Sequence, residues 1–372
     1  MKKEIYQYWL ANLTRIGPRK TEMLLKTFGS AETVFHASKE ELEKTIFEKN
    51  LSEGTIILNT DIETLVQHRD LKKAQEEYAR LIEKGISFIT KEDDCYPEKL
   101  KQIYDAPYAI YVRGNLPSNN RKALAIVGAR NCSSYGKEMA RYIAGAVAKE
   151  GISIISGLAR GIDSFAHEGA LAEDGITYGI LGCGIDICYP QENIKLYMNM
   201  QQRGGIISEY APGVKPLPSN FPMRNRIISG LCDGILVIEA KKKSGSLITV
   251  DMGLEQGKEI YALPGRTVDI MSEGCNNLIK MGAKLVTSPK DILEDFILEY
   301  TEKPFVKNKV VMQSEQEERV YACLNSEQKH IEEIALLTRL PVEQLMELLL
   351  VLELRGVIKQ TRKNYYSKML QF

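Results

Sequence analysis

The sequence predicts an α/β fold: an extended, Rossmann-like, doubly wound parallel sheet, with an N-terminal helical domain and a C-terminal winged helix. Nine short apolar runs between residues 86 and 286 are typical of buried strands, and segments of helical periodicity lie between them. Nine strands exceed the six of a common dinucleotide-binding fold, which indicates an extended sheet. The two ends of the chain lack this alternation, so we expect them to fold as separate domains.

The centre of the predicted sheet is a strand, loop, helix, strand unit. An apolar run at 124–127 ends in Gly128, helical spacing follows over 137–149, and a second apolar run occupies 152–155. Short runs without polar residues fit strands that are buried on both faces of a parallel sheet.

The turns of this unit predict an anion site. Gly128 and Arg130 follow the first strand, and Ser156 and Gly157 follow the second. These turns fall at the carboxyl ends of the strands, where open α/β sheets bind ligands. Glycine lets backbone N–H groups approach an anion, the next helix N-terminus adds positive charge, and arginine offers a bidentate donor. We therefore expect a phosphate site here.

Residues 1–70 are predicted to be helical. A helix, a turn at Gly17 and Pro18, and a second helix that ends at Gly29 resemble a helix-hairpin-helix. In such a hairpin, backbone N–H groups and nearby cations could hold a phosphate, and the cations here are Arg15, Arg19 and Lys20. A small helical bundle that uses Gly17 and Pro18 only as a turn is an equally good interpretation.

Residues 71–301 form the predicted sheet domain, which begins with a helix at 74–83. Its strands are expected at 86–90, 108–112, 124–127, 152–155, 176–181, 206–208, 235–239, 260–263 and 284–286. Its later helices are expected at 137–149, 193–202, 246–257 and 277–281.

The end of the chain predicts a linker and a winged helix. Residues 302–312 are charged and lack periodicity, and residues 313–372 contain three helical segments and a small hairpin. The helix that would enter a DNA groove carries Glu343, Glu347 and Glu353 and no Lys or Arg. Because phosphate repels an acidic helix, we predict a packing or partner-binding role for it rather than DNA reading.

Composition restricts the partners. The 372 residues include 49 basic and 49 acidic side chains, so only a local basic patch could attract a nucleic acid. No segment approaches the ~20 apolar residues of a membrane span, and the N-terminus lacks a signal-like segment. The seven cysteines form no CxxC pair and the four histidines are scattered. A reduced, cytoplasmic protein without a metal or a cofactor is therefore expected.

A loop with an aromatic residue and two arginines predicts a contact with single-stranded nucleic acid. Phe221 precedes Arg224 and Arg226 at the start of a predicted helix. A ring beside guanidinium groups suits an unpaired base and its phosphates. The alternative is a core Phe221, with the arginines paired to Glu209 or Asp233.

A second loop opens a helix with small residues. Ser244, Gly245 and Ser246 would cap this helix and leave backbone N–H groups for a phosphate. The lysines before them, which begin at Lys241, are either part of the same anion site or an ordinary solvated turn.

Seven ordered sequence blocks resemble the DNA-processing protein A family (DprA, also called Smf). They read VGAR, SGLARGID, GCGIDICYPQEN, SEYAPG, FPMRNRIISGL, EAKKKSGSLIT and GCNNLIKMGAKLV. The resemblance is dense over residues 85–300, and the two terminal domains agree with the family in position.

The resemblance implies a non-enzymatic protein that binds single-stranded DNA, protects incoming strands in natural transformation and helps load a RecA-type recombinase. It implies a homodimer, here through Ile279 and Leu285. Where some relatives are expected to carry a lysine, this chain has Gln191, so Lys195 or one of the lysines at 241–243 is expected to replace it. The expected DNA contacts are Gly128, Arg130, Ser156, Gly157, Phe221, Arg224, Asn225, Arg226, Lys241, Ser244, Gly245 and Ser246.

Three other function classes fit parts of the sequence. A nucleotide phosphoribohydrolase shares the sheet class, and Asp251 and Glu255 lie four residues apart on one helical face, but the PGG-x-GT signature of those enzymes is missing. A dinucleotide-dependent oxidoreductase lacks its GxGxxG turn and its acidic strand end. An adaptor would use the same loops only for the fold, and charge reversal at Arg130 and Arg224 would separate it from a DNA-binding protein.

Overall fold

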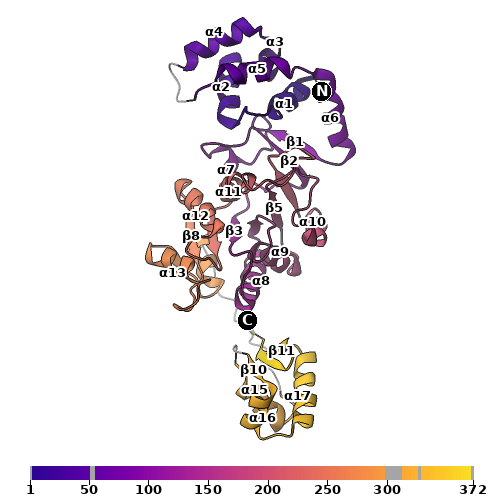
Figure 1. The fold of residues 1–372 in the computed structure, drawn as a ribbon, viewed down its shortest axis with the longest axis vertical. Helices are drawn as coiled ribbons and strands as arrows, with labels where there is room; N and C mark the ends of the chain where they lie inside the picture. The colour runs from indigo at the N-terminus through magenta and orange to yellow at the C-terminus, as the bar shows by residue number, and fades with distance from the viewer. Residues whose placement is uncertain (1, 51–54, 298–311, 326–327, 370–372) are drawn as a thin grey trace. The chain divides into compact units, whose positions relative to one another are not determined.

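The computed structural model describes residues 2–50, 55–297, 312–325 and 328–369 (Figure 1). The chain divides into two compact units, Met1–Tyr300 and Thr301–Phe372. Of the predicted linker, residues 302–311 lie outside the described residues. No helix in the described ranges is long and apolar enough to cross a membrane.

Helices at the start of the first unit lie beside one end of its sheet (Figure 1). Tyr8 packs edge-on against Phe88 of β1 and Tyr111 of β2, with ring centroids 5.4 and 6.4 Å away, so aromatic contacts attach the helices to the sheet. The elements are α1 (Lys2–Ala11), α2 (Pro18–Phe28), α3 (Ala31–His36), α4 (Lys39–Asn50), α5 (Asn59–Gln67), α6 (Leu71–Glu83), β1 (Ser87–Thr90) and β2 (Ala109–Gly114).

The predicted hairpin between α1 and α2 is present. Gly17 has an extended backbone directly before the first residue of α2. Two of the three cations near this turn are engaged inside the chain: Lys20 Nζ lies 2.6 Å from Asp61 Oδ2, and the Arg19 guanidinium lies 4.1 Å from the centre of the Tyr104 ring. These contacts favour the interpretation of a helical bundle with a turn.

The described residues of the sheet form nine strands, as predicted, in the order β1-β2-β6-β5-β4-β3-β7-β8-β9. From β6 to β9 every neighbouring pair is parallel, whereas β2 runs antiparallel to both β1 and β6. The remaining strands are β3 (Ala123–Val127), β4 (Ser153–Ser156), β5 (Thr177–Leu181), β6 (Gly204–Ser208), β7 (Gly234–Val237), β8 (Glu259–Ala262) and β9 (Lys284–Leu285).

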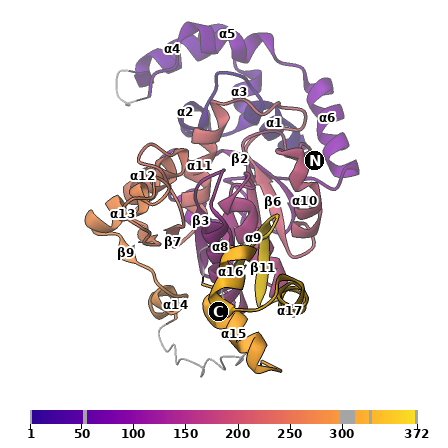
Figure 2. The same ribbon diagram turned by 60° about the horizontal axis from the view of Figure 1, so that its bottom comes forward.

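Helices cover both faces of the sheet, as a doubly wound fold requires. In β3, Leu124 and Ile126 belong to the apolar core under α8 and α9, whereas Ala125 and Val127 belong to the core under α11 and α12. Helices α11 and α12 lie side by side (Figures 1 and 2). The helices are α7 (Glu98–Lys101), α8 (Ser134–Lys149), α9 (Ile162–Ala172), α10 (Ile194–Met200), α11 (Asn220–Leu231), α12 (Gly245–Glu255), α13 (Glu273–Lys280) and α14 (Lys290–Phe296).

The strand order reverses direction at β3. The chain passes from β3 outward through β4, β5 and β6, and then returns to place β7 on the other side of β3. At such a reversal the loops that leave neighbouring strands diverge and open a crevice at the carboxyl ends of the strands. The loops after β3 and β7 therefore border a ligand-binding position.

The second unit is the winged helix that the sequence predicts. Leu345, Leu349 and Leu352 of α17 fill its core. A three-stranded sheet in the order β10-β12-β11 completes it. Its elements are α15 (Glu315–Cys323), β10 (Lys329–His330), α16 (Ile331–Thr338), α17 (Val342–Leu354), β11 (Ile358–Arg362) and β12 (Tyr365–Lys368).

Candidate nucleic-acid interface

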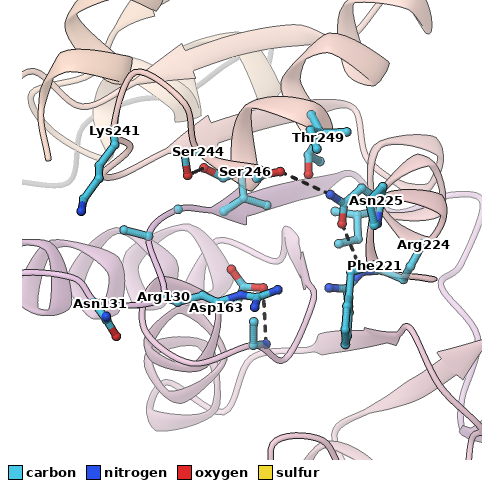
Figure 3. Close-up of a pocket in the computed structure, with 18 of the residues that line it drawn as sticks. Arg130, Asn131, Asp163, Phe221, Arg224, Asn225, Lys241, Ser244, Ser246 and Thr249 are labelled. Atoms are coloured by element: carbon cyan, nitrogen blue, oxygen red, sulfur yellow. Dashed lines mark hydrogen bonds between the residues drawn. The ribbon is translucent and has the colours of Figure 1, made fainter. Parts of the chain in front are cut away.

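A cavity of about 600 Å³ opens at the reversal of the strand order. Its walls are the loop after β3 with Arg130 and Asn131, the start of α11 with Phe221, and the loop from β7 into α12 with Lys241 and Lys243 (Figure 3). The fold thus brings three loops that are far apart in the sequence together at the carboxyl ends of the strands. A cavity of this size can hold a small ligand or part of a polymer.

An arginine and two aromatic rings face one another at this cavity. The exposed Arg130 extends toward Phe221, and its guanidinium carbon lies 5.5 Å from the centre of that ring (Figure 3). The exposed ring of Tyr189 stacks on Phe221 at 5.7 Å with an angle of 30°. Phe221 is half-buried and lines the cavity, so the core alternative for this residue is wrong. A Cβ at Gly182 would lie 2.8 Å from Phe221 Cδ1, which explains the glycine there.

Arg224 lies at the base of the cavity and is only 4% exposed. Its Nη1 donates to the carbonyl oxygens of Gly157, at 2.6 Å, and Ile180. Burial lowers the pKa of Arg224, and the nearby Asp163 opposes this shift. The charge of Arg224 therefore lies under the cavity, where it joins the ends of β4 and β5, and its role as a DNA contact stays a prediction.

The turn after β4 is satisfied from within the chain. Asp163 Oδ2 accepts the backbone N–H groups of Gly157 at 3.1 Å and Ala159 at 3.4 Å. Ser156 is fully buried, and its hydroxyl donates to Ile126 O at 2.6 Å. The prediction that Ser156 and Gly157 receive a phosphate is wrong, because a carboxylate of the protein already takes that place.

A second carboxylate occupies the N-terminus of α8. Glu239 Oε2 accepts the backbone N–H of Ser133 at 2.8 Å, and its Oε1 is bonded to the Ser133 hydroxyl. A Cβ at Gly136 would collide with this carboxylate. Gly128 lines the cavity, but a Cβ there would clash with Ile162 and the Glu239 carbonyl. The glycine serves close packing, and the expected contribution of α8 to a phosphate site is absent.

The N-terminus of α12 differs, because no carboxylate caps it among the described residues. Ser244 is the N-cap residue and makes no side-chain cap bond, although its Oγ lies 2.8 Å from Ser246 Oγ. The first N–H groups of a helix have no acceptor within the helix. Asn225 Nδ2 reaches Gly245 O at 3.5 Å and so connects α11 to this turn (Figure 3). The exposed Lys241 and Lys243 add positive charge beside it.

Arg226 does not line the cavity. It is buried, with Nη2 at 2.6 Å from Glu209 Oε1 and Nε at 3.1 Å from Asp105 Oδ2. The expected DNA contact at Arg226 is therefore wrong, and the alternative pairing with Glu209 is the one found. The other carboxylate weighed for this pairing, Asp233, pairs with Lys99 at 2.6 Å.

Two lining residues were not among the expected contacts, Tyr189 and Asn131. The sequence signal for Tyr189 is its position in the glycine-rich loop after β5, and Asn131 is a neighbour of a predicted contact. Gln191 stands where some relatives are expected to carry a lysine. Among the lysines expected to take over that role, Lys241 and Lys243 line the cavity and Lys195 does not.

The carboxylates of the hydrolase alternative lie elsewhere. Asp251 and Glu255 are exposed on α12 and do not line the cavity. Asp163 lines it, but its Oδ2 accepts backbone N–H groups. Within the described ranges, no three or more His, Cys, Asp or Glu side chains are grouped to hold a metal ion.

Comparison with known proteins decides the family. The family model described as DNA recombination-mediator protein A matches residues 87–297, which is more than half of the chain. The chain belongs to the DNA-processing protein A (DprA) family. A model described as the DprA winged helix domain matches residues 312–362, in agreement with the second unit.

Named DprA relatives support the assignment. DNA processing protein DprA of Streptococcus pneumoniae is 45% identical over 204 residues, which cover 55% of this chain and 72% of the relative. Protein Smf of Escherichia coli is 38% identical over 284 residues, which cover 74% of this chain and 76% of the relative.

Solved DprA structures agree with the fold. The X-ray structure of DprA from Streptococcus pneumoniae has a TM-score of 0.64 and 34% identity, and the match covers 81% of this chain and 99% of that one. A DprA structure from Helicobacter pylori, described for its single-stranded DNA binding mode, has a TM-score of 0.52 and 28% identity over 58% of this chain and 97% of that one.

Proposed function

We propose that the cavity binds single-stranded DNA and that it does so without catalysis. The observation that carries the proposal is the position of Arg130 5.5 Å from Phe221, with the exposed ring of Tyr189 stacked on the same phenyl group. A base can stack on such rings, which contributes roughly 1–3 kcal/mol per base in proteins that bind single strands.

The rim of the cavity supplies the contacts for phosphates. Arg130, Lys241 and Lys243 are exposed cations that line the cavity. The uncapped turn at Ser244 and Gly245 presents backbone N–H groups and the positive end of the α12 dipole. Arg224 adds charge from below and holds the strand ends that form the base of the cavity.

The arrangement favours a single strand over a duplex. In a duplex the base faces are stacked on one another, so rings on a cavity wall cannot reach them. The contacts proposed here use phosphates and base faces rather than base edges, so we expect little dependence on sequence. The single-stranded DNA binding mode described for the Helicobacter pylori relative supports this proposal.

We further propose that the protein acts as its family resemblance implies. It protects incoming single strands in natural transformation and recombination and helps to load a RecA-type recombinase. A homodimer formed through Ile279 and Leu285 would place two cavities on one strand and raise the affinity by avidity. Leu285 is exposed on β9, at the edge of the sheet, and Ile279 is half-buried on α13.

Titration of labelled oligothymidine tests the binding site. We expect Arg130→Ala to weaken binding at least tenfold and to make the salt dependence less steep by about 0.7 in log K against log salt, because one phosphate contact is lost. Arg203→Ala is the matched control, since Arg203 is exposed, lies at the amino end of β6 rather than at a carboxyl end, and pairs with Asp174.

Three results would contradict the proposal. One is equal affinity for a duplex and a single strand at moderate salt. Another is release of base from nucleoside monophosphates that is lost in Asp251→Ala, which would restore the hydrolase alternative. The third is unchanged binding in Arg130→Ala, which would place the DNA elsewhere.

A further inference from the structure

Helix α17 of the winged helix is apolar on two sides. Leu345, Leu349 and Leu352 fill the core of the unit. On the other side, Met346, Leu350 and Leu354 are 55%, 57% and 79% exposed. A surface helix of a folded domain normally has one apolar side. The second apolar side of α17 therefore has no partner among the described residues of its own unit.

The exposed side chains form a row, which we call the α17 stripe: Val342, Met346, Leu350 and Leu354. Residues four apart lie above one another on a helix, so the stripe runs along α17 for ~18 Å, at 1.5 Å per residue. Leu336 and Leu337, both exposed in the last turn of α16, precede it by only a few residues. Contiguous exposed apolar side chains of this kind mark interaction sites.

Acidic side chains border the stripe. Glu343 and Glu347 are exposed on α17, and each lies three residues before a residue of the stripe, Met346 and Leu350, so they are its neighbours on the helix surface. Glu332 and Glu333 are exposed in the first turn of α16. At the end of α17, the guanidinium of Arg355 is paired with the Glu317 carboxylate at 2.9 Å. This pairing reduces the extent to which Arg355 offsets the charge of the exposed glutamates. The exposed Arg339 lies in the turn between the two helices, so the surface is apolar at its centre and predominantly negative at its margin.

We propose that the α17 stripe docks a basic amphipathic helix of a partner protein. The apolar residues of such a helix would cover the stripe, and its Lys and Arg side chains would meet Glu343 and Glu347. The length of the stripe matches about three to four turns of a partner helix, and docking of an amphipathic helix on an apolar surface is a common recognition mode. The proposal is independent of DNA binding in the first unit.

Charge disfavours the other occupants. DNA would bring phosphates to a surface with four exposed glutamates and is repelled. A second copy of this helix, packed antiparallel about the middle of the stripe, would bring the two copies of Glu347 close together. Like charges at such a contact weaken the pairing.

Binding of two designed peptides to the full chain tests the proposal. One labelled 18-residue helical peptide carries leucine on one side and lysine on its flanks, and the other has glutamate in place of each lysine. We expect the lysine peptide to bind at least tenfold more tightly. The double variant Glu343→Lys, Glu347→Lys should reverse this preference, and Leu350→Asp should weaken binding of the lysine peptide at least tenfold.

Leu254→Asp is the matched control, because Leu254 is an exposed leucine of the first unit. It should leave peptide binding unchanged, and oligothymidine binding should be the same in Leu350→Asp as in the unaltered chain. Equal binding of both peptides, or no effect of Leu350→Asp in a variant whose circular dichroism is unchanged, would overturn the proposal. So would a sedimentation result in which Leu350→Asp abolishes self-association while peptide binding persists.

Discussion

The Glu239 carboxylate accepts the backbone N–H of Ser133 at 2.8 Å and thereby occupies the N-terminus of α8. Open α/β sheets commonly receive a phosphate at this position, because the helix dipole and the free N–H groups attract an anion. Asp163 does the same for the turn after β4. The protein therefore fills two anion positions with its own side chains and leaves the turn at α12 for an external one.

Replacing Glu239 with alanine should destabilise the fold. The substitution removes the charge-assisted hydrogen bonds that hold Ser133, the N-cap residue of α8, so we expect a loss of about 1–3 kcal/mol in the free energy of unfolding, measured by urea denaturation. Sulfate should raise the melting temperature of Glu239→Ala more than that of the unaltered chain, because the emptied site accepts an anion. Glu255→Ala, at an exposed position, is the control and should show neither effect.

A methyl group at Gly182 should disturb the aromatic wall. A Cβ there would lie 2.8 Å from Phe221 Cδ1, so the ring must shift away from its contact with Tyr189. We expect Gly182→Ala to weaken oligothymidine binding several-fold. Gly17→Ala is the control, because no atom lies within 4 Å of its added Cβ. Unchanged affinity in Gly182→Ala would show that the ring position does not matter for binding.

His167 should remain neutral in the folded protein at any pH near neutrality. Burial lowers the pKa of His167 to about 3, and its Nδ1 lies 2.6 Å from Thr177 Oγ1. The unfolded chain binds a proton below about pH 6.5, so stability should fall as the pH drops below that value, by about 2 kcal/mol for this group between pH 7.5 and 5.0.

Proton NMR measures this group directly. The His167 ring signals should not shift between pH 5 and 8, and a midpoint near 6.5 would contradict the prediction. Denaturation curves report the His167 contribution less directly, because other groups change the stability over the same pH range. Burial raises the pKa of Asp163 and of Glu209, so protonation of these two carboxyl groups favours the folded state at acid pH.

The proposed dimer surface can be tested at one residue. Leu285 is exposed on the edge strand β9, and an arginine there would place a charge in an apolar contact. We expect Leu285→Arg to shift sedimentation from dimer to monomer. Ile82→Arg, at an exposed position on α6, should leave the dimer intact. If Leu285→Arg still sediments as the unaltered chain does, the dimer forms through another surface.

The sequence predicts the sheet well because its strands carry a local signal. Runs such as 124–127 contain no polar residue, and glycine marks where several of them end. The direction of β2 has no such signal, because strand direction depends on which neighbour a strand pairs with. The start of α8 at Ser134, three residues before the first predicted helical residue, depends on the cap at Ser133.

The role of each arginine was harder to predict than the presence of the loop. Arg224 and Arg226 are two residues apart and both are buried, yet one lies under the cavity and the other pairs with Glu209 and Asp105. The partners come from other strands and loops, so local sequence carries no information about them. The same is true of Glu239, which binds the N-cap residue of a helix that begins far earlier in the chain.

The reversal of the strand order also sets when the site can form during synthesis. Arg130 leaves the ribosome early, but β7 and the turn at Ser244 follow more than a hundred residues later. Until β7 inserts beside β3, the cavity lacks the wall formed by the loop from β7 into α12. A nascent or truncated chain that stops before β7 would carry Arg130 and Phe221 and would still lack the complete cavity that we propose for single-stranded DNA.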